Sequence, residues 1–165
     1  MEIYDGQSFV KYLDKVKART ARLFDFIPED KIEWTYQKGK FTIGDQIRHL
    51  AAIERFMYVE NVQLKPSKYK GCGIELAEGK EAIINFYLQM QKESRAVFER
   101  LSHEEMEMKC ETPGGVKITV WKWLRALIEH EVHHRGQLYM YLAMLGVKTP
   151  PLYGLTSEEV ISRSV

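Results

Sequence analysis

Residues 119–146 read TVWKWLRALIEHEVHHRGQLYMYLAMLG, a long run in which apolar side chains recur every three or four positions. That spacing places the apolar side chains on one face of a helix. Gly146 is a typical residue to follow a helix, because glycine adopts the left-handed backbone conformation at little cost. The run therefore predicts one long amphipathic helix that begins near Thr119.

Three earlier stretches have the same periodicity. They run from about Gln7 to Phe26, from the N-cap Thr42 to about Leu64, and from roughly Lys80 to Leu101. Together with the last stretch they make four helices of about 20 residues, which predicts an all-α four-helix bundle. We expect a single domain over residues 1–165, because no linker, repeat or low-complexity tract interrupts the chain.

The connections between these helices differ in character. Residues 31–42 and 65–79 are rich in turn-forming residues, and we expect both to be irregular. Residues 109–120, KCETPGGVKITV, alternate polar and apolar residues around Pro-Gly-Gly, which predicts a small hairpin before the last helix. After two prolines, residues 156–164 carry the S/T-x-x-E pattern of a short terminal helical turn.

Composition excludes several classes of function. The 165 residues are 45% hydrophobic and 28% charged with a net charge of +1, so nothing indicates a nucleic-acid partner or a polybasic membrane contact. The amino terminus lacks the pattern of a secretion signal, and no segment reaches the ~18–20 apolar residues of a membrane span. Cys72 and Cys110 are isolated and typical of reduced thiols. We expect a cytoplasmic protein.

The histidines carry the clearest chemical signal. His130 and His134 are four residues apart, so both imidazoles lie on one face of the last helix and can reach one metal ion. His49 lies midway along the second helix, where residues from different helices of a bundle meet, and it is the candidate third ligand. On spacing alone, a hydrogen-bonded core histidine is an equally good interpretation. We expect His133 to be a surface or supporting group and His103 to lie on the surface.

Residues 130–134 also match H-E-x-x-H, the pattern of zinc peptidases. The metzincin extension needs a glycine and a histidine where this chain has Gln137 and Met140. The thermolysin-like version needs a glutamate on a second helix, and Glu158 or Glu159 could supply it only from the short tail. These departures disfavour a peptidase.

Residues 123–147, followed by PPLYG, closely resemble the carboxy-terminal signature of the DinB/YfiT-like superfamily, H-x-x-x-H-R-G-Q. FTIGDQIRHLAAIE, residues 41–54, resembles the second-helix motif of the same superfamily. The resemblance implies that His49, His130 and His134 bind a divalent metal, with zinc or nickel as the usual ion. It also implies an up-down-down-up four-helix bundle, often dimeric, with the metal at one end of a pocket.

The superfamily includes transferases that use low-molecular-weight thiols such as bacillithiol, while other members are described only as metal-dependent hydrolases. The resemblance thus implies a metal-dependent thiol S-transferase acting on a small molecule, with a hydrolase or a non-catalytic metal- or ligand-binding dimer as alternatives. The sequence assigns no catalytic residue. Glu131, Glu54 and Asp45 are candidate general bases, and Gln46 and Gln137 could line the pocket.

Other residues near the histidines have structural interpretations. Gly136 lies inside a helix, where glycine is unfavourable, so we expect a neighbouring helix to approach closely there. Arg135 is expected to anchor a loop or a carboxylate. Trp121, Trp123 and Tyr139 are expected to pack in the core.

Overall fold

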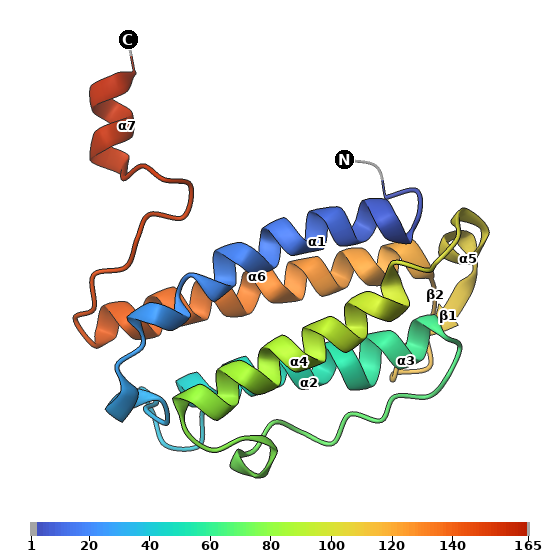
Figure 1. Ribbon diagram of the computed structural model, residues 1–165, viewed down its shortest axis with the longest axis horizontal. Helices are drawn as coiled ribbons and strands as arrows, with labels where there is room; N and C mark the ends of the chain where they lie inside the picture. Colours follow the sequence, from blue (N-terminus) through green and yellow to red (C-terminus); the bar gives the residue numbers. More distant parts are fainter. Residues whose placement is uncertain (1–2, 165) are drawn as a thin grey trace.

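The computed structural model describes residues 3–164 and arranges four long helical segments side by side (Figure 1). They are α1 (Gly6–Ala21), α2 (Ile43–Ile53) with its continuation η3 (Glu54–Tyr58) and α3 (Val59–Val62), α4 (Lys80–Phe98), and α6 (Val120–Met144). The second and third segments run in one direction, and the first and last run in the other (Figure 1). The up-down-down-up helical bundle is therefore confirmed.

Local hydrogen bonds explain where the helices begin and end. The Thr42 hydroxyl accepts from the backbone N–H of Asp45, and the Asp45 carboxylate accepts from the backbone N–H of Thr42. Such a reciprocal cap satisfies two backbone donors that the first turn leaves unpaired. Helix α6 ends before Gly146, whose φ of +72° is the left-handed conformation expected there.

The second helical segment differs from the sequence prediction. Over Glu54–Tyr58 it forms a π-turn, in which the N–H of Val59 bonds to the carbonyl oxygen of Glu54. This wider turn rotates the residues after it to a different face of the helix. Such turns are frequent at functional sites. Apolar periodicity did not reveal it, because the segment is buried or half-buried on both sides of the turn and gives no exposed face to mark the change.

The smaller elements surround the bundle ends. They are η1 (Phe24–Phe26), η2 (Glu29–Lys31), η4 (Ile74–Leu76), α5 (His103–Glu107), β1 (Lys109–Glu111), β2 (Lys117–Thr119) and α7 (Ser157–Arg163). The hairpin is confirmed, since β1 and β2 pair antiparallel with Cys110 opposite Ile118. The terminal turn is confirmed as α7, which extends away from the bundle (Figure 1). The first helix was predicted too long, because α1 ends at Ala21 and a 3-10 turn carries the chain to Phe26.

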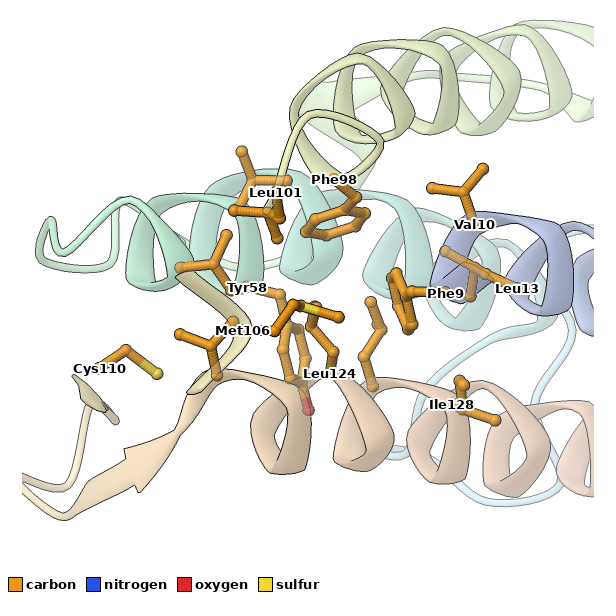
Figure 2. Close-up of a cluster of buried hydrophobic side chains, with 14 of the residues drawn as sticks. Phe9, Val10, Leu13, Tyr58, Phe98, Leu101, Met106, Cys110, Leu124 and Ile128 are labelled. Atoms are coloured by element: carbon orange, nitrogen blue, oxygen red, sulfur yellow. The ribbon is translucent and has the colours of Figure 1, made fainter. Parts of the chain in front are cut away.

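Buried apolar side chains from all four helical segments hold the bundle together. Figure 2 shows the cluster at the hairpin end, where Met106 of α5 belongs to the same group of buried side chains as Tyr58 and Leu124. Phe9 and Phe98 meet edge to face with their ring centroids 5.4 Å apart. Burying each such side chain stabilises the fold by about 1.5–3 kcal/mol, so this cluster fixes helix α6 firmly.

Two further observations concern the sequence predictions. Cys72 and Cys110 are both buried free thiols, as expected. None of the helices within residues 3–164 combines the length and the apolar character that a membrane crossing requires.

Candidate metal centre

The structure brings the three predicted histidines together. His49 comes from α2, and His130 and His134 lie one turn apart on α6. One ring nitrogen from each lies within 4.8 Å of the others, and Nε2 of His49 is 3.0 Å from Nε2 of His130. Within residues 3–164, no carboxylate or thiol joins this group.

The donor set fits a divalent ion. Two imidazole nitrogens bound to one tetrahedral ion at ~2.0–2.1 Å lie roughly 3.3 Å apart, close to the separation of the His49 and His130 nitrogens. The Nδ1 atoms of His130 and His134 are buried, and neither has a hydrogen-bond partner among the described residues. For His130 this is the ring nitrogen that does not face His49, so Nε2 is the atom placed to bind an ion together with His49.

The electrostatics keep these imidazoles neutral. Burial lowers the pKa of His49 to about 3, and His134 and His130 add to the effect. Burial likewise lowers the pKa of His134 to about 4, and it lowers the pKa of His130. A neutral imidazole presents a free lone pair, so at neutral pH a metal ion would not have to displace protons from these rings.

Tyr69 orients His49. Its hydroxyl lies 2.7 Å from Nδ1 of His49, which directs Nε2 toward His130. The segment that carries Tyr69 is tied to the second helical segment, because the N–H of Lys68 donates to the carbonyl oxygen of Phe56 at 2.7 Å. Sequence reasoning missed Tyr69, since it lies in an irregular connection with no periodic pattern.

Arg48 precedes His49 on α2 and holds the connection of residues 65–79, which also carries Tyr69. It is fully buried, and its guanidinium donates to the carbonyl oxygens of Cys72 and Ala77 at 3.0 and 2.9 Å. It also pairs with Glu33 at 2.8 Å. Arg48 therefore joins the two irregular connections on either side of His49, a role that the sequence did not indicate.

Phe41 lies over the histidine group. Its ring centroid is 5.3 Å from that of His49, and the ring stacks on His134 at 6.5 Å. The Tyr141 hydroxyl donates to the carbonyl oxygen of Phe41 at 3.0 Å and holds this segment in place. Next to His134 the surface opens into a cleft of about 850 Å³.

The three candidate general bases have other partners. Glu54 and Glu131 are buried with Lys17, whose Nζ lies 2.6 Å from Glu54 and 3.7 Å from Glu131. The Tyr87 hydroxyl donates to Glu131 at 3.0 Å. Asp45 caps α2 and pairs with a guanidinium nitrogen of Arg48 at 2.7 Å. Because Glu131 is engaged in the bundle interior, the H-E-x-x-H match lacks its water-activating carboxylate.

The expectations for the remaining polar residues had mixed outcomes. Gln137 lines the cleft, as expected, and its Nε2 lies 3.0 Å from Nε2 of His133. Gln46 is buried and does not belong to the cleft lining. His133 and His103 are exposed, as expected.

Two expectations on α6 were wrong. Among the described residues no helix approaches Gly136, since a Cβ built there would meet no heavy atom of residues 3–164 within 4 Å. Arg135 holds neither a loop nor a carboxylate, because it donates to the carbonyl oxygen of Val16 on α1 at 3.1 Å. Trp121, Trp123 and Tyr139 pack against the two apolar clusters, as expected.

Comparison with known proteins agrees with this architecture. The sequence model of the DinB family matches residues 3–163. A DinB-like protein from Bacillus cereus ATCC 10987 has a solved structure that superposes with a TM-score of 0.72 at 16% identity, over 87% of this chain and 94% of that one. The DinB-like protein YjoA from Bacillus subtilis gives a TM-score of 0.67 at 16% identity, over 88% and 96%.

The same YjoA, described as an uncharacterized protein of Bacillus subtilis strain 168, is also similar in sequence. It is 32% identical over 60 residues, which is 35% of this chain and 39% of YjoA. The matched segment thus spans well under half of that relative.

Proposed function

This chain belongs to the DinB family, and from that premise we propose that it is a divalent-metal-dependent enzyme that transfers a low-molecular-weight thiol to a small electrophilic molecule. The observation that carries the proposal is the convergence of three neutral imidazoles, from two helices, beside an open cleft. Three protein ligands leave a tetrahedral ion one position for another molecule, which is typical of catalytic rather than structural sites.

His49, His130 and His134 would hold the ion. A zinc or nickel ion bound there would supply Lewis acidity, which favours the ionised form of a thiol at neutral pH. Other side chains position the histidine ligands. Tyr69 fixes the orientation of His49, and the ring of Phe41 packs against the rings of His49 and His134.

The surroundings favour thiol transfer over hydrolysis. Hydrolysis benefits from a general base that removes a proton from water, yet Glu54, Glu131 and Asp45 are all engaged elsewhere. An ionised thiol needs no such base. In the transfer its sulfur forms a bond to an electrophilic carbon, the leaving group departs with the bonding electron pair, and the thiol proton passes to solvent.

Turnover by metal-loaded protein tests the proposal. Protein loaded with zinc or nickel would be incubated with 1-chloro-2,4-dinitrobenzene and either bacillithiol or N-acetylcysteine, and thioether formation followed by absorbance. We expect a rate above the uncatalysed reaction that disappears in His49→Ala and persists in His103→Ala. Hydrolysis of 4-nitrophenyl acetate without any thiol activity would instead favour the hydrolase, and the absence of both activities would favour a binding role.

A further inference from the structure

The cleft beside His134 lies between helix α6 and the connection that precedes α2. The α6 surface around Gly136 forms one side, and Tyr36 and residues 39–41 form the other. Because His134 belongs both to the cleft lining and to the histidine group, the cleft borders the candidate metal centre. Its volume of about 850 Å³ is in the range of small-molecule binding sites.

Gly136 keeps this side of the cleft open. Glycine inside a helix is unfavourable unless something requires it, and close packing is the usual reason. Packing does not apply here, because a Cβ on Gly136 would meet no heavy atom within 4 Å. A larger side chain at this position would occupy space that now belongs to the cleft, so the absence of a side chain serves the cavity.

Four of the ten lining residues present aromatic or apolar side chains. Tyr36, Phe41 and Tyr141 contribute aromatic rings, and Met140 contributes a thioether. Phe41 and Met140 are 41% and 58% exposed, so both present apolar surface to solvent at the cleft. Aromatic rings and a flexible thioether suit the faces of a flat apolar molecule.

The charge of the lining has one sign. Lys40 is the only Lys or Arg among the ten lining residues, and none of the ten is an aspartate or glutamate. A positive charge without a competing carboxylate attracts an anion.

We propose that this cleft binds the acceptor substrate, a flat apolar molecule with one carboxylate or similar anionic group placed near Lys40 and its apolar body over Gly136. The role of acceptor rests on the proposed function, while the binding of such a molecule rests on the cleft alone. A polyhydroxylated thiol is a poorer occupant, because the aromatic rings and the thioether of Met140 make much of the lining apolar.

Binding of 2-naphthoate and its neutral analogue 2-naphthamide tests the charge. Isothermal titration calorimetry on the full metal-loaded chain should show that naphthoate binds about fivefold more tightly, the size expected of one exposed ion pair. Lys40→Gln should remove this preference. Lys38→Gln, on the same connection but outside the lining, should retain it. Equal binding of the two probes to the wild type would overturn the proposal.

Substitution of Gly136 tests the location. Gly136→Leu should abolish binding of both probes while the metal content stays at the wild-type level, and Gly136→Ala should still bind them. Undiminished binding to Gly136→Leu would overturn the proposal. Failure of the metal-loaded wild type to bind either probe would also overturn it, as expected if a second copy of the chain covers the cleft. Wild-type protein that binds naphthoate but no metal would refute the proposed function and leave the cleft assignment standing.

Discussion

The Tyr69 hydroxyl lies 2.7 Å from Nδ1 of His49, so a residue of an irregular connection fixes the orientation of a candidate ligand on α2. Only one of the two ring nitrogens of His49 can face the other histidines, and the contact with Tyr69 leaves Nε2 for that role. Partners of this kind usually hold the tautomer and the ring plane of metal-binding histidines.

Removing this hydroxyl should weaken metal binding. We expect Tyr69→Phe to lower the affinity for zinc roughly 10- to 100-fold, since the ring of His49 loses its fixed orientation. Competition with a chromophoric chelator measures the change. Tyr153→Phe, at a 77% exposed position, is the matched control. An unchanged affinity in Tyr69→Phe would show that the contact does not support the site.

The buried cluster of Lys17, Glu54 and Glu131 should contribute to the free energy of unfolding. Lys17 is 5% exposed and faces the carboxylates of Glu54 and Glu131. Lys17→Met leaves these carboxylates without a buried cation, and we expect the free energy of unfolding to fall by about 3–5 kcal/mol. Urea denaturation followed by circular dichroism measures it. Lys15→Met, at an exposed position of the same helix, should change the value little, and a similar small change for Lys17 would contradict the expectation.

The histidine group should make the metal-free protein sensitive to acid. In the folded state the pKa values of His49 and His134 are about 3 and about 4, below the ordinary value of 6.5. As the pH falls below 6.5 the unfolded chain therefore binds protons that the folded chain does not, and stability decreases until the folded-state pKa values are reached. Thermal melts in chelator between pH 7 and pH 4.5 should show this decrease.

The matched variants separate the histidines from other titrating groups. His49→Ala should show a shallower decrease between pH 6.5 and pH 5, because one depressed imidazole has been removed. His103→Ala, at the exposed start of α5, should follow the wild type. Parallel curves for His49→Ala and the wild type would refute the burial of a neutral imidazole at this position.

Gly136 should be a site where stability can be gained. A Cβ there meets no neighbouring atom, and alanine is favoured over glycine in a helix interior by about 1 kcal/mol. We therefore expect Gly136→Ala to raise the free energy of unfolding by about that amount in urea denaturation. A loss of stability would contradict the open space around Gly136.

The sequence predicted the regular parts of this molecule because they depend on local patterns. Thr42, Gly146 and the Pro-Gly-Gly turn mark ends that short-range hydrogen bonds determine, and the structure confirms all three. The four-residue spacing of His130 and His134 guarantees a shared helix face, so their proximity followed once the helix was recognised.

The remaining features depend on contacts between distant segments. Tyr69 reaches His49 only because the connection after α3 runs back along the second helical segment, and no local pattern encodes that path. The π-turn that begins at Glu54 involves one additional residue in a hydrogen-bonded ring, which apolar periodicity cannot detect. Gly136 was misread because helical glycine usually indicates close packing, whereas here it borders an open cleft.

Metal content is the most direct test of the proposed site. Protein purified without a nickel column would be analysed for zinc and nickel as the wild type and as His49→Ala, His134→Ala and His103→Ala, with circular dichroism to confirm the helical fold. We expect about one ion per chain in the wild type and in His103→Ala, and a loss in the other two variants. Metal retained without His49 or His134, or no metal in the wild type, would contradict the assignment of these histidines as ligands.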